Sequence, residues 1–397
     1  MKIAAIFAMN QIISHGFGVF LFAALVPMMR ESIDVSNWHL AAIGALTQLA
    51  YLSGALLLGL FGHRVASSKL ILITGAVTTS LLFSMSLLKD PLTITVVLVM
   101  LAASAAISWG TIVEIISRCA KAQQCSTQLS TAASGTAWGY GINGLIILYV
   151  VPGLGWQSGW QLAAVLGVVV LLLTWRLLSG IQSSSIQVEK KDSQRGLSAM
   201  QLAKTVVSQR PALVACLVCV LVGFTTMPFA VWLNTYFDQL GLAADVGGYT
   251  WTTVGITGML AGVMIGRFAD SYGNSAALVF ICGGFFLCLC AFIYNPSRFA
   301  LLAGCGYGLM YFPVWGVLAG WIRQSYSSTV TMQISSICMV GSGLGGALGN
   351  LLAGYLRDTS GSLDVVYQTL AAAALLMFVV AIVGTRARTP QLLIEAA

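Results

Sequence analysis

The sequence carries little charge. Only 8% of its 397 residues are Asp, Glu, Lys or Arg, whereas 58% are hydrophobic, and the mean hydropathy is +0.90. Soluble domains average about 25% charged residues. The composition therefore excludes a soluble globular protein, and it predicts an all-α integral membrane protein, because the apolar runs have the length of spanning helices.

Residues that could form a catalytic or metal-binding site are also scarce. The only histidines are His15, His39 and His63, which lie on separate segments. Metal-dependent and nucleophilic enzymes need clustered His, Cys or acidic groups, and ATP-driven proteins need a Gly-rich Lys motif that is missing here. We therefore expect no enzyme, no resident metal and no cofactor.

Twelve apolar runs are long enough to span a bilayer, for which a helix needs about 20 residues. The first is too long for a cleaved signal sequence and should remain as a helix. The runs cover approximately residues 3–29, 39–61, 70–88, 92–113, 129–151, 159–179, 212–236, 248–268, 275–294, 299–321, 331–356 and 363–384.

The net charge of +7 indicates topology rather than nucleic-acid binding. If the N-terminus is cytoplasmic, only four of the 19 Lys and Arg residues lie outside, and the other fifteen lie inside. By the positive-inside rule, both termini are cytoplasmic and the protein sits in the cytoplasmic (inner) membrane. The basic side chains are expected to contact membrane lipids. The four outer residues are Arg30, Lys89, Arg298 and Arg357.

A polar segment, Gly180–Arg210, divides the runs into six plus six. We expect an N-terminal bundle at 1–180, a cytoplasmic linker at 181–210 that is partly helical near its end, and a C-terminal bundle at 211–397. The halves also match at a constant offset of 207 residues, as a duplicated six-helix unit would. The matched pairs are Gly16 with Gly223, Phe17 with Phe224, Gly59 with Gly266, Gly139 with Gly346 and Asn143 with Asn350.

The loop "GRFADSYG" carries the sharpest motif, with Gly266, Arg267, Asp270 and Gly273. Twelve spans in two related halves, together with this loop, resemble the major facilitator superfamily of secondary transporters. The resemblance implies two pseudo-symmetric six-helix bundles, with Asp270 as a latch on the positive N-terminal end of segment 129–151. The alternative is a loop carboxylate paired with nearby Arg267.

The corresponding loop of the first half, "GLFGHRVASSK", keeps Gly59 and Arg64 but has His63 at the acidic position. A latch against segment 331–356 is therefore expected to be weaker. In segment 129–151, "SGTAWGYGING" resembles an antiporter glycine pattern but has Tyr140 in place of its proline. This partial match is the reason to keep an exporter as an alternative.

The polar stretch "MNQIISHGFGVF" interrupts the first apolar run. On a helix, Gln11, Ser14, His15 and Gly18 share one face, with Asn10 beside it. At the 207 offset the positions of Asn10, Gln11, Ser14 and His15 are Leu217, Val218, Leu221 and Val222, so a helix at this place does not require polarity. The resemblance implies that the first helix lines a central cavity, and we therefore expect these side chains to face a hydrated cavity rather than lipid. The alternative is a structural hydrogen bond that holds His15 inside the bundle.

Glu114 and Arg118 stand four residues apart at the cytoplasmic end of segment 92–113. They form a proton-coupling pair if Glu114 lies within the hydrocarbon, or a simple helix-end ion pair if it lies at the interface. The proton-coupling candidates are His15, Glu114 and Arg118.

Aromatic and hydroxyl groups complete the predicted solute site, although each aromatic side chain has packing or the interfacial belt as its alternative role. These candidates are Ser108, Trp109, Trp138, Tyr140, Thr226, Trp232, Tyr307, Tyr311 and Trp315.

The expected function is secondary active transport of a small organic solute, neutral or anionic, by alternating access and with proton coupling. The alternative is an amphiphilic drug or metabolite exporter working as a proton antiporter. A non-transporting sensor or an intramembrane enzyme is less favoured. The expected partners are the solute, protons and lipids, without nucleic acid, and the fold is expected to act as a monomer.

Overall fold

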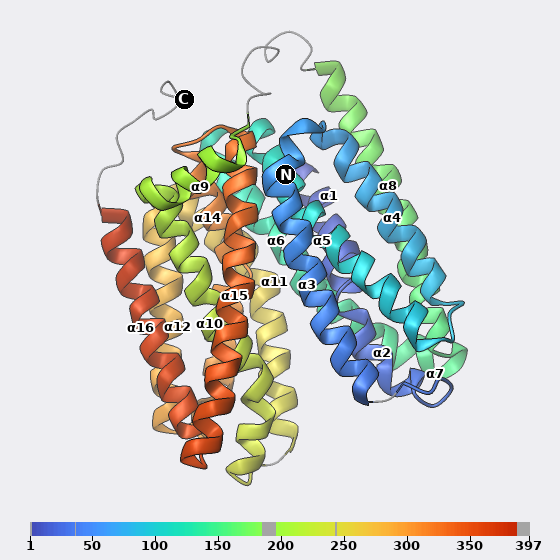
Figure 1. Ribbon diagram of the computed structural model, residues 1–397, viewed down its shortest axis with the longest axis vertical. Coiled ribbons are helices and arrows are strands. Elements are labelled where there is room, and N and C mark those ends of the chain that lie inside the picture. Colours follow the sequence, from blue (N-terminus) through green and yellow to red (C-terminus); the bar gives the residue numbers. More distant parts are fainter. Residues whose placement is uncertain (1, 36, 185–195, 243, 387–397) are drawn as a thin grey trace. The chain divides into compact units, whose positions relative to one another are not determined.

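The computed structural model describes residues 2–35, 37–184, 196–242 and 244–386, and these residues form helices and short connections without any strand (Figure 1). Every one of the twelve predicted apolar runs is largely helical, which confirms the all-α class. Eleven described helices are long and apolar enough to cross a membrane. The first run is not among them, because its helix is broken into shorter pieces.

The first half of the chain forms twelve helical elements. They are α1 (Lys2–Gln11), the π-helix η1 (Ile12–Phe17), α2 (Leu21–Met29), α3 (Asn37–Phe61), the 3-10 turn η2 (Gly62–Arg64), α4 (Ser67–Met85), α5 (Pro91–Cys119), the 3-10 turn η3 (Ala122–Gln124), α6 (Cys125–Leu145), the π-helix η4 (Ile146–Val150), α7 (Val151–Leu154) and α8 (Trp156–Ser184).

The second half begins with a short helix in the predicted linker. Its elements are α9 (Ala199–Ser208), α10 (Arg210–Gln239), α11 (Ala244–Tyr272), α12 (Asn274–Tyr294), α13 (Pro296–Tyr311), α14 (Val314–Arg323), α15 (Ser328–Ser360) and α16 (Asp364–Arg386). Residues 185–195 of the linker lie outside the described residues.

The chain folds into two compact units. The N-terminal unit comprises the described residues of Met1–Ala120, Thr131–Leu197 and Ser328–Ser336. The C-terminal unit comprises those of Lys121–Ser130, Ser198–Ser327 and Ile337–Ala397. The first turns of α6 and α15 thus belong to the unit of the opposite sequence half. Functional bundles bounded at 1–180 and 211–397 stay a prediction.

Two helix starts follow directly from local sequence. Asp90 caps α5, because its Oδ2 accepts the Thr93 amide at 2.8 Å, and Pro91 occupies the first helical position. This hydrogen bond lowers the pKa of Asp90 below its ordinary value. The linker helix α9 begins at a capping box between Ser198 and Gln201.

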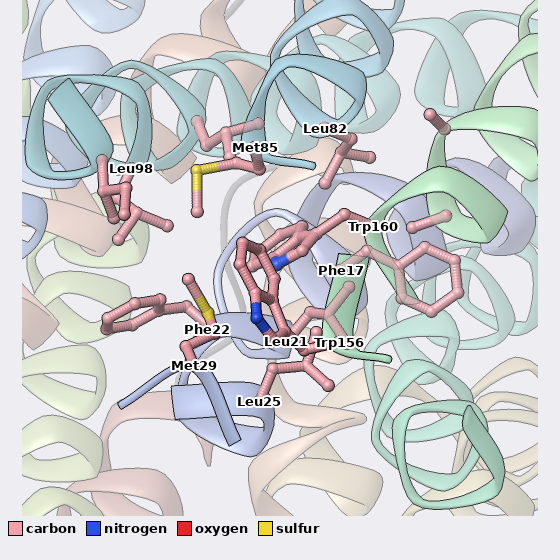
Figure 2. Close-up of a cluster of buried hydrophobic side chains, with 14 of the residues drawn as sticks. Phe17, Leu21, Phe22, Leu25, Met29, Leu82, Met85, Leu98, Trp156 and Trp160 are labelled. Atoms are coloured by element: carbon pink, nitrogen blue, oxygen red, sulfur yellow. The ribbon is translucent and has the colours of Figure 1, made fainter. Parts of the chain in front are cut away.

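An apolar cluster holds the N-terminal unit together, in which α4 packs against α5 and α8. Figure 2 shows Trp156 and Trp160 of α8 beside Leu21 and Leu25 of α2. The indole Nε1 of Trp156 donates to Ser32 Oγ at 2.9 Å. This packing fixes the C-terminal part of the broken first segment, α2, against α8.

Aromatic rings fill the core of the C-terminal unit, where α16 packs against α10 and α12 (Figure 1). The ring of Phe229 lies 5.3 Å from Tyr307 and 5.9 Å from Tyr367, centroid to centroid. Tyr236 donates from its hydroxyl to Asp364 Oδ1 at 2.6 Å. These contacts bind α10 to α13 and α16.

The glycines that match across the repeat lie at equivalent helix crossings. A Cβ added at Gly16 of η1 would lie 2.6 Å from Gly139 Cα of α6. In the C-terminal unit, a Cβ added at Gly223 of α10 would overlap Ser342 O and would lie 3.0 Å from Gly346 N of α15. Each crossing therefore requires glycine for close backbone approach.

We predict that Gly139→Ala destabilises the protein by about 1–3 kcal/mol, because the new methyl group meets backbone rather than a movable side chain. Gly144→Ala on the same helix is the matched control, since its Cβ meets nothing within 4 Å. Thermal unfolding in detergent measures both. Equal melting temperatures for the two variants would contradict the crossing.

Candidate functional site

The backbone of the first segment changes to a π-helix between Ile12 and Phe17, where the sequence predicts a continuous helix. The Gly18 amide donates to the carbonyls of Ile13 and His15, and the Val19 amide donates to His15 O at 3.1 Å. Neither of these two amides donates to the carbonyl of Ser14. π-turns often mark functional sites, and this one falls on the polar stretch.

The polar side chains of this stretch reach three different helices. Asn10 Nδ2 donates to Ile6 O at 2.9 Å and to Thr174 Oγ1 of α8 at 2.8 Å. Gln11 packs against α6, where a Cβ at Gly135 would lie 2.8 Å from Gln11 Cβ. The single helical face expected from a 3.6-residue period is absent, because the wider π-turn rotates the residues that follow.

His15 contacts α3. Its Nε2 lies 3.1 Å from Tyr51 Oη, its Nδ1 lies 3.1 Å from Ser14 Oγ, and the His15 and Tyr51 rings meet edge to face at 5.8 Å. The side chain is 9% exposed. A ring with a partner on each nitrogen has a fixed orientation and can pass a proton between them.

Two cavities of the N-terminal unit flank the break. A small cavity of about 10 Å³ lies between α1, η1, α4, α5 and α8 and includes Asn10, Ser14 and Ser108 in its lining. A larger apolar cavity of about 300 Å³ lies between α2, α3 and α5. His15 lines neither of these two cavities.

The other predicted residues of the N-terminal unit differ in burial. Trp109 on α5 is buried, whereas Trp138 and Tyr140 on α6 are exposed. The ring of Tyr140 stacks on Phe20 at 4.5 Å. Trp138 is therefore available to a solute or to lipid, and Trp109 serves the interior of its unit.

Glu114 is a buried carboxylate near the C-terminal end of α5. It accepts hydrogen bonds from Ser67 at the start of α4, from Thr329 at the start of α15 and from the guanidinium of Arg118, with which it forms an ion pair. A negative charge at two helix N-termini is electrostatically favourable. The group ties α4, α5 and the first turn of α15 together.

The predicted residues of the C-terminal unit lie on three helices, α10, α13 and α14. On α13, Tyr307 is buried and Tyr311 lies 5.1 Å from it. On α10, the Thr226 hydroxyl is committed to Val222 O at 2.6 Å, and the Trp232 ring lies under Arg357 at 5.7 Å. Trp315 lies on α14, after the bend at Pro313.

Asp270 at the end of α11 sits at the N-terminus of α6. Its two carboxylate oxygens accept the amides of Ser126 at 3.0 Å and Thr127 at 2.9 Å. These amides, rather than the exposed guanidinium of Arg267, are its partners. A Cβ at Gly266 would lie 2.6 Å from Thr127 Cα, so this glycine permits the close approach.

Gly273 turns the chain directly between α11 and α12. Its φ of +94° lies in the left-handed region that favours glycine. Beside it, Ser126 Oγ donates to Asn274 Oδ1 at 2.7 Å. The loop motif thus folds as one cluster around the first turn of α6.

In the first-half loop, Gln333 of α15 takes the position that Ser126 holds in the repeat. Gln333 Nε2 donates to Gly59 O and to Leu197 O, both at 2.9 Å, and Leu197 N donates to Gln333 Oε1 at 2.8 Å. Its Nε2 lies 3.4 Å from His63 Nδ1. The side chain of Gln333 therefore joins α15 to the first-half loop and to Leu197 of the linker, with the amide on the helix rather than a carboxylate on the loop.

Arg64 points away from this cluster. It is exposed and its guanidinium lies over the Phe61 ring at 5.1 Å.

The family model described as Major Facilitator Superfamily matches residues 9–333. The chain belongs to the major facilitator superfamily. It is therefore an integral membrane protein and a secondary transporter for small solutes, and not an enzyme. No curated protein sequence matches the chain significantly.

Solved structures of the superfamily share this fold at low identity. FucP of E. coli, a fucose:proton symporter, crystallised in the outward conformation, superposes with a TM-score of 0.74 at 13% identity, over 98% of this chain and 99% of that one. The proton:xylose symporter XylE gives 0.72 at 12% identity, over 95% and 94%. The human organic anion transporter MFSD10 gives 0.73 at 14%, over 96% and 99%.

Three polar residues of this superfamily member were not singled out by sequence reasoning: Tyr51, Thr329 and Gln333. The 207-residue offset points to Gln333, because it is the equivalent of Ser126. Tyr51 and Thr329 lie on ordinary apolar or hydroxyl-rich segments. Only the tertiary packing brings them to His15 and Glu114.

Proposed function

We propose that the chain moves a small organic solute, neutral or anionic, across the cytoplasmic membrane by alternating access coupled to protons. The single observation that carries this proposal is the polar break in the first segment of a superfamily fold, which holds His15 between two hydroxyl groups. An ionisable group at this depth is costly and is a functional hypothesis by default.

The buried charges favour a neutral or anionic solute. Among the described residues, Glu114 is the one acidic side chain that is fully buried, and it is already paired with Arg118. No unpaired buried carboxylate is thus offered to a cation in the described part. The names of FucP, XylE and MFSD10 span two sugars and organic anions, which is the same chemical range.

The helix starts at α6 and α15 are the proposed latch. Asp270 with Gly266, Arg267 and Gly273 would hold the start of α6, and Glu114 with the Gly59–Arg64 loop would hold the start of α15. Charges and carbonyls at helix N-termini make bonds that can break and reform as access alternates.

We predict that Asp270→Asn lowers stability by about 1 kcal/mol, as loss of a capping charge does, and slows transport about fivefold, the factor that about 1 kcal/mol represents. The neutral amide accepts only one of the two amide hydrogen bonds. Thermal unfolding and initial uptake rates measure the two effects. Asp358→Asn, at an exposed carboxylate of α15, is the control, and equal behaviour of both variants would remove the latch.

A thermal-shift panel tests the solute class. Purified protein is heated with monosaccharides, monocarboxylates, dicarboxylates, amino acids and polyamines at several pH values. A bound solute raises the melting temperature by mass action. We expect a neutral or anionic solute to do so in the parent protein and to fail in His15→Ala. Stabilisation by polyamines alone would contradict the proposed class.

One observation favours the exporter as a second candidate. The cavity of about 300 Å³ is lined by apolar groups of Val19, Phe22, Val26 and Ile43, among others, with Thr47 as its polar side chain. Such a cavity suits the apolar part of an amphiphile. Stabilisation by hydrophobic dyes, lost in Ala23→Phe, which narrows the cavity, would support the exporter.

A further inference from the structure

Oxygen-bearing side chains make up just over half of the lining of the small cavity beside the helix break. Six of its eleven lining residues are polar, and they come from α1, η1, α4 and α5. Its volume of about 10 Å³ holds one particle of the size of a water molecule. The polar lining residues are Asn10, Ser14, Thr74, Thr78, Thr79 and Ser108.

Most protons of these groups are already donated elsewhere. Asn10 donates its two Nδ2 protons to Ile6 O and Thr174 Oγ1. Thr74 donates to Leu70 O at 3.0 Å, and Thr79 donates to Gly75 O at 2.7 Å.

Thr78, the remaining hydroxyl of α4 in the lining, also donates its proton to another group. Ser104 donates to Thr74 O at 3.2 Å, so in the 2.9 Å contact between Thr78 and Ser104 the proton comes from Thr78. What these groups still have free is lone pairs.

Two further oxygens at this place lack a usual partner. Ser108 is 3% exposed and lines the cavity, and it makes no hydrogen bond within the described part of the chain. The carbonyl of Ser14 accepts no hydrogen bond from the amides of Gly18 and Val19. Carbonyls at the break of a discontinuous membrane helix are Na⁺ ligands in other transporter folds.

We infer that this cavity binds one Na⁺ ion. A lining that is rich in lone pairs and poor in protons accepts a cation better than another hydrogen-bond acceptor. The lining holds no carboxylate, whereas divalent Ca²⁺ and Mg²⁺ sites are built with carboxylates. Neutral oxygens and room for a single small particle fit a small monovalent cation, and a water molecule is the alternative occupant that the experiment distinguishes.

The ion joins the two pieces of the first segment to α4 and α5. Because Ser14 contacts both the cavity and His15, occupancy would also orient the His15 ring. The orientation of the His15 ring matters for transport only if the proposed function holds. The binding of Na⁺ to the cavity does not depend on that function.

Purified full-length protein without solute tests the inference. Thermal unfolding is followed in NaCl, KCl and choline chloride at equal ionic strength, and equilibrium binding of radioactive Na⁺ is measured in parallel. We expect a saturable rise in melting temperature with Na⁺ alone, and Na⁺ binding at one site per chain. Equal melting temperatures in the three salts and no bound Na⁺ would show that the cavity holds water only, and would overturn the inference.

Variants locate the ion. Ser108→Ala and Thr78→Val are each expected to weaken Na⁺ binding at least about tenfold, the usual scale for loss of a group at a metal site. The matched control is Thr95→Val, because Thr95 is also a buried hydroxyl of α5 but is bonded to Pro91 O at 2.7 Å, outside the cavity. Undiminished Na⁺ binding by both cavity variants would contradict the location. Solute flux is read separately, so its failure would leave Na⁺ binding intact.

Discussion

Replacement of His15 with alanine is expected to abolish proton-driven accumulation of solute while the protein stays folded and inserted. His15 is the one titratable side chain in the polar break, and it connects Ser14 to Tyr51 on α3. A positioned proton-transfer group contributes at least about a hundredfold in rate. Uptake into proteoliposomes under an imposed pH gradient measures this loss.

Tyr51→Phe separates the proton role of His15 from its packing role. The variant keeps the edge-to-face ring contact at 5.8 Å and removes the hydroxyl partner of Nε2. We expect it to fold normally and to shift the pH profile of uptake without abolishing uptake. Full accumulation by His15→Ala at every pH would remove His15 from the proposed site.

Glu114→Leu is expected to cause the largest loss of stability. It leaves Arg118 without its ion-pair partner, and it strips the Ser67 and Thr329 hydroxyls of their acceptor. Breaking a buried ion pair costs about 3–5 kcal/mol. Because Arg118 is 30% exposed, solvent reduces this to about 2–3 kcal/mol. Denaturation in detergent measures the change.

A double variant, Glu114→Leu with Arg118→Met, is the matched control. Replacing both members of a buried pair with apolar groups is neutral or stabilising in other proteins, so most of the stability should return. Transport should stay slow, because the bond to Thr329 at the start of α15 is lost. A double variant as unstable as Glu114→Leu would contradict the ion-pair explanation.

Glu114→Gln distinguishes the two roles that the sequence leaves open. The amide keeps an acceptor for Ser67 and Thr329 but cannot titrate. Retained proton-driven accumulation would make Glu114 a latch residue, and solute flux without accumulation would make it a coupling residue.

Hydropathy and charge predict much of the fold. The twelve apolar runs are properties of single segments, so the sequence alone indicates where the helices are, whereas the orientation inferred from Lys and Arg stays a prediction. Asp270 could be singled out for a similar reason, because its loop motif is local. The structure then supplies its partners, the amides of Ser126 and Thr127.

The interior of the site depends on contacts between distant segments. The polar residues Asn10 to His15 coincide with the break in the first helix, but a periodicity of 3.6 puts them on one face. The π-helix instead distributes them among α3, α6 and α8. The roles of Gln333 and Tyr51 likewise appear only when residues 274 and 36 positions away come into contact with them.

Solute flux in proteoliposomes tests the central claim most directly. Purified protein is reconstituted, a pH gradient is imposed, and the solutes that raise the melting temperature are offered with a radioactive label. We predict that at least one neutral or anionic solute accumulates above its outside concentration and that a protonophore collapses the gradient of solute. A folded, reconstituted protein that binds such a solute but moves none of it in either direction would contradict the claim.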